Sequence, residues 1–243
     1  MNVLEENNML EINNLSKSFD EVEVLNIPQL NVKSGELVGI VGNNGAGKTT
    51  LFRLCLDLLK GEKGNVKIEN EDVSQTEMWK NFTGSFLDER FLIDFLTPEE
   101  YFYFIGEIYG KTKAEVDEIL LDFRQFMANE ILGKKKYIEK FSKGNKQKIG
   151  IVGAILMRPK LLILDEPFNY LDPSSQIEMK NILQRYSAEF GTTILLSSHN
   201  IQYVADICNR IVVIERGKIV RDEIGATPAI REELEKYFEN VRI

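Results

Sequence analysis

Residues 42–50 read GNNGAGKTT, and this stretch decides the fold. It has the form G-x-x-x-x-G-K-[ST], a loop whose backbone N–H groups surround a polyphosphate. The run before it, 37–41, is LVGIV and indicates a buried strand. The apolar residues after it fall on one face of a helix, and they are Leu51, Leu54, Cys55, Leu58 and Leu59. Gly61 suits the end of that helix. A loop between a strand and a helix N-terminus is the setting that phosphate binding needs.

Every residue of this loop is a candidate ligand of a nucleoside triphosphate. The set is Gly42, Asn43, Asn44, Gly45, Ala46, Gly47, Lys48, Thr49 and Thr50. Lys48 would reach the β- and γ-phosphates, and Thr49 would ligate Mg²⁺. A glycine-rich turn without function is the alternative, and the flanking strand and helix disfavour it.

The composition narrows the class of protein. At 243 residues the chain supports one large domain or two small lobes. Its formal net charge of −8 provides no overall basic surface, so we expect no nucleic-acid partner. Cys55 and Cys208 have no C-x-x-C partner, and Cys55 lies on the apolar helix face. We expect Cys55 to be a small buried hydrophobe, which fits a reducing cytoplasm.

Neither end-targeting nor membrane-spanning segments are evident. The first ten residues, MNVLEENNML, lack the cationic and apolar regions of a signal peptide. The longest apolar runs, such as 161–164, are far shorter than the ~20 residues that a bilayer span needs. We therefore expect a cytoplasmic chain whose membrane role, if any, comes through a partner.

The chain alternates between strand-like and helix-like patterns. Strands are predicted at 9–15, 22–25, 29–32, 37–41, 66–68, 161–164, 193–197, 211–215 and 218–221, with a two-residue hairpin turn at 216–217. Helices are predicted from Thr97, at 113–127, 144–157, 174–190 and 201–208, and as a charged surface helix at 228–238. A helical block thus interrupts a nucleotide-binding sheet, which predicts an α/β fold.

Two carboxylates follow the apolar run at 161–164. A buried parallel strand would deliver Asp165 to its carboxyl end, beside the phosphate loop. Asp165 would then hold Mg²⁺, usually through water. Glu166 would lie near the γ-phosphate and polarise the attacking water as general base. The alternative, a strand that ends in a solvated acidic turn, loses ground once the phosphate loop is considered.

His199 is the only histidine in the chain, and it follows another predicted core strand. A lone histidine is usually a surface group or a satisfied core group. At this edge of the sheet, however, its imidazole could contact the γ-phosphate and orient the water. The stretch at 141–148, FSKGNKQK, leads into a predicted helix and on its own would be a solvated basic turn.

Together these segments resemble the ATP-binding subunit of ABC transporters over essentially the whole chain. The phosphate loop corresponds to 42–50, the Walker B strand with its glutamate to 161–166, the switch histidine to His199 and the D-loop to 170–172. Phe19 corresponds to the aromatic residue that stacks on adenine. The signature loop, usually LSGGQ, is FSKGN at 141–145.

This sequence departs from the family pattern at two places. In the signature loop Ser142 and Gly144 are retained, whereas Lys143 and Asn145 are replacements. In the family this loop meets ATP bound to the opposite subunit, so the resemblance implies that Ser142 and Gly144 bind nucleotide there. The Q-loop glutamine aligns with Asp88, or with Glu89 one residue on, and a carboxylate there could approach Mg²⁺. A similar string, YSKGMKQ, and an acidic Q-loop occur in a branch of exporter ATPases.

The resemblance implies a P-loop NTPase core with a mostly parallel sheet, an antiparallel β subdomain and an inserted α-helical subdomain. The single ABC ATPase domain would comprise the core at 1–87 and 159–225, the helical subdomain at 88–158 and a C-terminal helical tail at 226–243. ATP and Mg²⁺ would bind between two head-to-tail subunits, which are two copies of this chain or this chain and a paralogue. An integral-membrane permease would recruit them to the inner face of the cell membrane, with export as the expected direction.

Aromatic residues gather near the start of the helical block, at 91, 95 and 101–104. They either fill the core of that block or form a groove for a partner's cytoplasmic helix. A non-transport ABC ATPase and a nucleotide-dependent scaffold with little turnover are the alternative functions. The chain lacks an Asn-Lys-x-Asp guanine motif, which argues against a GTPase.

Overall fold

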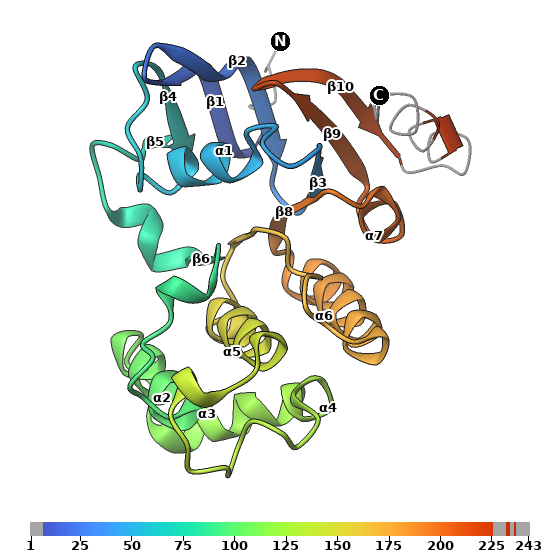
Figure 1. Ribbon diagram of the computed structural model, residues 1–243. Coiled ribbons are helices and arrows are strands. Elements are labelled where there is room, and N and C mark those ends of the chain that lie inside the picture. Colours follow the sequence, from blue (N-terminus) through green and yellow to red (C-terminus); the bar gives the residue numbers. More distant parts are fainter. Residues whose placement is uncertain (1–6, 226–231, 234–235, 237–243) are drawn as a thin grey trace.

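The computed structural model describes residues 7–225 and residues 232, 233 and 236. Two sheets and a block of helices make up the described chain (Figure 1). The smaller sheet has the order β2-β1-β4-β5 and is antiparallel. Its strands are β1 Asn8–Phe19, β2 Val22–Lys33, β4 Lys63–Ile68 and β5 Glu71–Asp72. This sheet corresponds to the expected antiparallel β subdomain.

The larger sheet has six strands in the order β10-β9-β3-β8-β7-β6. They are β3 Leu37–Val41, β6 Thr83–Phe86, β7 Leu161–Leu164, β8 Thr193–Ser198, β9 Arg210–Glu215 and β10 Lys218–Ile224. All neighbours are parallel except β9 and β10, which form a hairpin. Positive φ at Arg216 and Gly217 suits the two-residue turn predicted there. The predicted mostly parallel α/β fold is confirmed.

The prediction of two short strands at 22–25 and 29–32 is wrong, because β2 runs through Pro28 without a break. Proline removes one ladder donor, which is tolerated on an edge strand. β2 is the edge of the smaller sheet, and its pairing with β1 continues on both sides, with Ile27 opposite Leu15 and Gln29 opposite Asn13.

The helix after the phosphate loop is shorter than predicted. α1 spans Lys48–Cys55 instead of reaching residue 59. Asp57 has a φ of 50°, in the left-handed region, and the Leu58 N–H donates to the Arg53 carbonyl at 2.9 Å. This hydrogen bond between residues five positions apart is typical of a Schellman motif, which ends a helix. Leu58 is consequently 52% exposed, although its spacing placed it on the apolar face.

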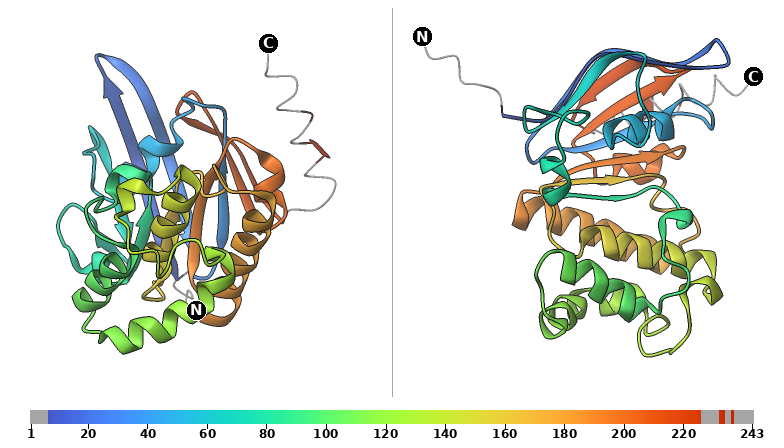
Figure 2. Two further views of the ribbon diagram at one scale, coloured as in Figure 1. Left: turned by 60° about the horizontal axis from the view of Figure 1, so that its bottom comes forward. Right: turned by 90° about the vertical axis from the view of Figure 1, so that its left-hand side faces the viewer.

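A helical block lies between β6 and β7 in the chain and extends from one face of the larger sheet, away from the smaller sheet (Figure 2). It contains α2 Pro98–Ile108, α3 Lys113–Leu120, α4 Arg124–Met127 and α5 Lys143–Ile155. The predicted start at Thr97 is confirmed as a reciprocal capping box with Glu100. The single helix predicted at 113–127 is interrupted by a 3-10 turn at Leu121–Phe123.

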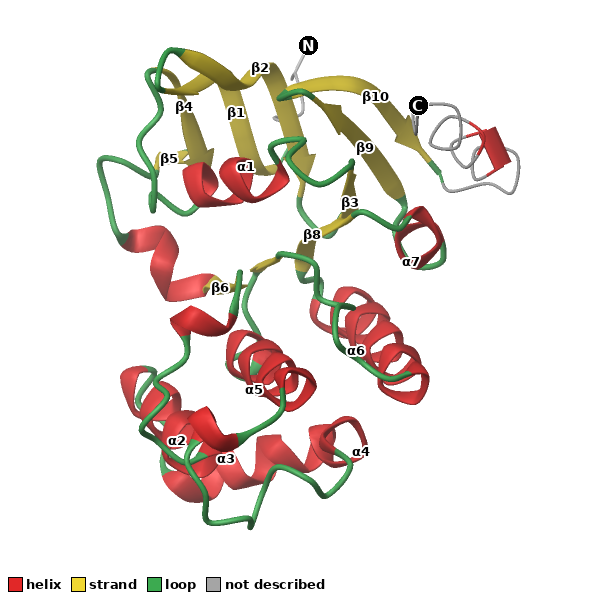
Figure 3. Cartoon of the chain, viewed as in Figure 1, coloured by secondary structure: helices red, strands yellow, loops and turns green. Residues whose placement is uncertain are grey.

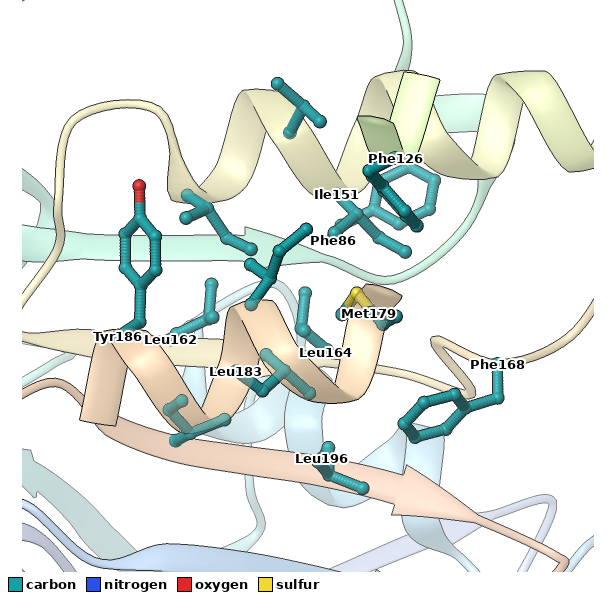
Figure 4. Packing of buried hydrophobic residues seen from close by; sticks show 14 of the residues in the cluster. Phe86, Phe126, Ile151, Leu162, Leu164, Phe168, Met179, Leu183, Tyr186 and Leu196 are labelled. Atoms are coloured by element: carbon teal, nitrogen blue, oxygen red, sulfur yellow. The ribbon is translucent and has the colours of Figure 1, made fainter. Parts of the chain in front are cut away.

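Two further helices flank the larger sheet, α6 Pro173–Phe190 and α7 Ile201–Ala205 (Figure 3). The central strands are buried on both faces, and alternate side chains enter different cores. Leu162 and Leu164 pack with α5 and α6 (Figure 4), whereas Leu161 and Ile163 join the core beneath α1. This sandwiched sheet fixes where its strand ends lie. The tail helix predicted at 228–238 lies almost wholly outside the described residues.

Candidate nucleotide site

Three neighbouring parallel strands deliver the candidate site to one edge of the sheet. β3 ends before Gly42, β7 before Asp165 and β8 before His199, with β8 between the other two. Because parallel strands end at the same edge, residues more than 100 positions apart are brought together there. The order of the strands therefore brings Gly42, Asp165 and His199 to one edge of the sheet, as predicted from the sequence.

The phosphate loop leads from β3 into α1. Gly42 allows a close approach of the chain, because a Cβ there would lie 2.3 Å from the Ile214 carbonyl oxygen. Gly47 is the N-cap of α1 and offers no side-chain cap. The first N–H groups of α1 therefore remain available to an anion, and the helix dipole favours one.

Lys48 lies within this loop and is buried. Its Nζ donates to the carbonyl oxygens of Gly42 at 2.6 Å and Asn43 at 3.3 Å. The same ammonium lies 3.3 Å from Glu166 Oε1. This ammonium is thus shared between the loop backbone and the carboxylate after β7.

Thr49 and Asp165, two of the three predicted ligands of Mg²⁺, contact each other. The Thr49 hydroxyl donates to Asp165 Oδ2 at 2.5 Å, and the Ser197 hydroxyl donates to Oδ1. Burial raises the pKa of Asp165, which means that its negative charge is penalised where it lies. A hydroxyl and a buried carboxylate form a donor set that suits Mg²⁺. Within the described part of the chain no group of three His, Cys, Asp or Glu side chains could hold a metal ion.

Glu166 contacts both other predicted catalytic residues. Its Oε1 faces Lys48, and its Oε2 lies 2.9 Å from His199 Nδ1 and accepts from the His199 N–H at 3.3 Å. His199 remains accessible, with 47% of its side chain exposed, whereas Glu166 is 20% exposed. The three side chains form one continuous contact chain beside the phosphate loop.

Asp88 and Glu89 line one cavity of about 290 Å³ together with Asp165 and Glu166. Both oxygens of Asp88 accept from the Arg90 guanidinium, at 2.9 and 2.7 Å, and these bonds lower the pKa of Asp88. The Asp88 carboxylate is therefore paired with the Arg90 guanidinium. Either acidic residue borders the same cavity, so the alignment with the Q-loop stays open.

Phe19 ends β1 at the tip of its hairpin with β2. Its ring is 47% exposed, and Lys17 Nζ lies 5.3 Å from the ring centre. β2 passes the phosphate loop at Val24, whose carbonyl oxygen lies 3.0 Å from the Cβ position of Gly47. Phe19 lies on β1, the neighbour of β2, and its accessible aromatic face can stack on a base.

Ser142 and Gly144 lie elsewhere, at the N-terminus of α5. Ser142 caps this helix by accepting from the Asn145 N–H at 3.3 Å. Both residues line an open cavity of about 410 Å³, bordered also by Tyr170 and Asp172. None of the phosphate-loop residues, all of which the structure describes, borders it. Lys143 and Tyr170 border both this cavity and the one beside Asp165 and Glu166.

Two residues that contact the site, Ser197 and Gln147, are not predicted from the sequence. Ser197 donates to Asp165 and also accepts from the Glu166 N–H at 2.8 Å. Gln147 donates through Nε2 to the Glu166 carbonyl oxygen at 3.2 Å. Ser197 was visible as a hydroxyl in the run before His199, and Gln147 lay in a stretch that reads as a solvated basic turn.

Residues 25–169 match the family model described as ABC transporter, and they make up more than half of the chain. The chain belongs to the ABC transporter family. It is accordingly an ATP-binding cassette ATPase. Its phosphate loop and the strand that carries Asp165 both lie inside the matched region.

Similar proteins include ABC transporter ATP-binding proteins named for lantibiotic transport and for methionine import. YcbN, an uncharacterized ABC transporter ATP-binding protein of Bacillus subtilis (strain 168), is 34% identical over 216 residues, covering 88% of this chain and 69% of YcbN. The lantibiotic transport ATP-binding protein SrtF of Streptococcus pyogenes is 32% identical over 236 residues, covering 96% of both. The methionine import ATP-binding protein MetN of Burkholderia thailandensis is 30% identical over 224 residues, covering 88% of this chain and 64% of MetN.

Solved ABC structures share the fold. One described as the ATP-binding subunit of an ABC transporter has a TM-score of 0.81 and 29% identity, with 93% of each chain covered. A dimeric ATP-binding cassette in a post-hydrolysis state, bound to ADP and Pi, has a TM-score of 0.78 over 89% of this chain and 98% of the other. At 23% identity the second likeness shows the fold alone.

Proposed function

We propose that this ABC ATPase works as a head-to-tail dimer that hydrolyses ATP and drives export through a separate membrane permease. The observation that carries the proposal is the contact chain Lys48–Glu166–His199 beside the Thr49–Asp165 pair. It places a cation, a carboxylate, an imidazole and a pair of metal ligands at the N-terminus of α1.

The phosphate loop, residues 42–50, would hold the triphosphate through the free N–H groups of α1, with Phe19 against the adenine. Lys48 would leave Glu166 and pair with the β- and γ-phosphates, which carry more charge than one carboxylate. Thr49 and Asp165 would hold Mg²⁺, with Asp88 at the edge of the same cavity. When bound, that ion neutralises charge on the phosphate oxygens.

Glu166 is the proposed general base. Once Lys48 turns to the phosphates, Glu166 can accept a proton from a water that attacks the γ-phosphorus, while the bond to the bridging oxygen of ADP breaks. His199, in contact with Glu166 and half exposed, would orient that water and contact the γ-phosphate. These roles need both side chains within hydrogen-bond reach of one water, which their 2.9 Å contact supports.

The dimer is proposed because the binding residues are divided between two places. Ser142 and Gly144 lie at the N-terminus of α5 and line an open cavity that no residue of the phosphate loop borders. A head-to-tail arrangement would give each ATP one phosphate loop and one α5 N-terminus. The partner would be a second copy of this chain or a paralogous ATPase.

The permease would dock on the helical block beside the edge strand β6. Phe102 is fully buried, whereas Phe91, Phe95 and Phe104 are 51%, 74% and 46% exposed. A cavity of about 340 Å³ lies on the same block, bordered by β6 and by Tyr101, Ile105, Ile108 and Tyr109. Ile108 and Tyr109 are 66% and 40% exposed, and exposed apolar groups around a groove suit an amphipathic helix of a partner. No helix in the described ranges is long and apolar enough to cross a membrane itself. A peripheral position on the inner face of the cell membrane is therefore proposed.

Export rests on the sequence likeness to exporter ATPases. SrtF, named for lantibiotic transport, aligns over almost the full length of both chains. MetN, named for methionine import, aligns over a smaller share of its own length. The signature string with lysine and the acidic Q-loop also favour the exporter branch.

Affinity purification from native membranes tests the proposal. Tagged Glu166→Gln protein, incubated with ATP and Mg²⁺, should retain the nucleotide and its partners because the base is absent while the ligands remain. A multi-spanning membrane protein should co-purify, and its sequence would identify the permease. Recovery of soluble partners alone would favour an assembly-factor ATPase, and recovery of nucleic acid would contradict the argument from net charge.

A further inference from the structure

The backbone of Glu166 is held in an unfavourable conformation. Its φ is 48°, in the left-handed region that residues with a long side chain rarely occupy. The next residue is Pro167, which biases the preceding residue toward extended backbone. Conformations of this kind persist only where surrounding contacts impose them, and here the residue is the proposed general base.

Three hydrogen bonds fix the peptide groups on both sides of Glu166. The Glu166 N–H donates to Ser197 Oγ at 2.8 Å. The Glu166 carbonyl oxygen accepts from the Asn169 N–H at 3.1 Å and from Gln147 Nε2 at 3.2 Å. Asn169 contributes only its main chain, and Ser197 also serves Asp165. Of the three partners, Gln147 is therefore the one whose substitution removes a hydrogen bond to the Glu166 backbone without changing a contact of Asp165.

Gln147 belongs to a face of α5 that packs on the loop following β7. Gly144, three residues earlier, lacks a Cβ that would lie 2.6 Å from the Tyr170 carbonyl oxygen. Lys148 Nζ lies 3.8 Å from Asp172 Oδ2, and both Lys148 and Gln147 are buried. Residues three and four apart share one helix face, so α5 contacts this loop both at Glu166 and at 170–172.

We infer that Gln147 is a positioning residue for the hydrolytic step: its amide holds the left-handed backbone of Glu166 and so directs the carboxylate toward Lys48 and His199. This inference rests on the proposed role of Glu166 as general base. α5 also carries Ser142 at its N-cap. One rigid helix thus connects the residue proposed to contact the partner's nucleotide with the base of its own site.

The test replaces Gln147 with methionine, which keeps the length of the side chain and removes the donor. Displacing a base by a fraction of an ångström lowers the rate of the chemical step, so kcat should fall roughly 10- to 100-fold. KM for ATP and the affinity for a fluorescent ATP analogue should stay within about twofold, because no phosphate-loop contact is lost. Gln147→Glu, which keeps the shape and cannot donate when ionised, should show the same pattern.

Gln176→Met is the matched control. Gln176 Nε2 donates to the Leu171 carbonyl oxygen at 3.1 Å, which is the same kind of bond to the same loop, five residues from Glu166. Its loss should change kcat by less than about twofold. An equal loss of kcat in both variants would mean that the loop needs general support and that Gln147 has no special role.

A double-mutant cycle separates this inference from the proposed function. In the Glu166→Gln background, Gln147→Met should lower the residual turnover by no more than about twofold, because the side chain it positions is already inactive. A further loss as large as in the wild-type background would overturn the inference. If Glu166→Gln is slow while both Gln147 variants turn over normally, the inference alone fails. Wild-type turnover of Glu166→Gln would instead refute the base assignment itself.

Discussion

Asp165 carries a negative charge that its surroundings penalise, although two hydroxyl groups donate to it. Such a group suits a cation-binding role better than a structural one. Asp165→Asn keeps the shape and removes the charge, so the nucleotide-free protein should become more stable, by ~1 kcal/mol or ~2–4 °C in Tm. The added stabilisation by ATP with Mg²⁺ should disappear at the same time.

Thermal unfolding of both proteins, with and without ATP and Mg²⁺, measures these opposite effects. Thr50→Ser is a suitable control, because Thr50 belongs to the loop but makes neither contact of Asp165. A drop in the Tm of nucleotide-free Asp165→Asn, with the ligand-induced shift retained, would contradict a cation-binding role.

The two cysteines are expected to be inert in the folded protein. Burial raises the pKa of Cys55 to about 12 and that of Cys208 well above its usual value. Since the thiolate is the nucleophile, and a raised pKa keeps the thiol protonated up to higher pH, neither should react with iodoacetamide at pH 8. Mass spectrometry of the native and the denatured protein checks this, and rapid native alkylation would be inconsistent with the burial of both cysteines.

At the scale of elements, the sequence predicted the strands that carry the site almost residue for residue. The runs 37–41 and 161–164 coincide with β3 and β7, because buried parallel strands are uniformly apolar and end in polar residues. The end of α1 and the continuity of β2 were not predicted. Those outcomes depend on Asp57 adopting a left-handed backbone and on Pro28 lying at a sheet edge, and both are tertiary facts.

The same contrast applies to the site. Convergence of Lys48, Asp165, Glu166 and His199 followed from topology, since each terminates or follows a parallel strand. Gln147 and Ser197 could not be singled out, because a glutamine within a basic stretch and a serine within a strand have no distinctive pattern. Their roles depend on which backbone groups they reach, and only the fold determines that.

The exposed aromatic residues of the helical block form the proposed docking surface for the permease. Phe95 is 74% exposed, so Phe95→Asp should cost little folding stability and leave basal ATP turnover unchanged. It should abolish co-purification with the membrane partner, because an unpaired carboxylate that an apolar partner surface would cover is strongly unfavourable. Ile224→Asp, on β10 at the opposite edge of the larger sheet, is 79% exposed before substitution and should leave co-purification intact. Loss of the partner in both variants, or in neither, would argue against this surface.

At the scale of the whole molecule, the division of the binding residues is the reason for proposing a dimer. The larger sheet brings the phosphate loop and Glu166 together, whereas the helical block carries Ser142 at the N-terminus of α5, beside a cavity that no phosphate-loop residue borders. Two copies arranged head to tail would complete two sites at once, with ATP contacting both subunits. Hydrolysis would then remove the contacts that join them, and the helical block would transmit the change to a permease.

Sedimentation velocity measures whether ATP joins two copies of this chain into a dimer. Glu166→Gln should sediment as a monomer with ADP and as a dimer with ATP and Mg²⁺, since all proposed ligands remain while hydrolysis is blocked. Adding Lys48→Ala to this variant should abolish the dimer by weakening nucleotide binding. A Glu166→Gln protein that binds ATP and Mg²⁺ yet sediments as a monomer throughout the micromolar range would contradict the ATP-dependent head-to-tail dimer.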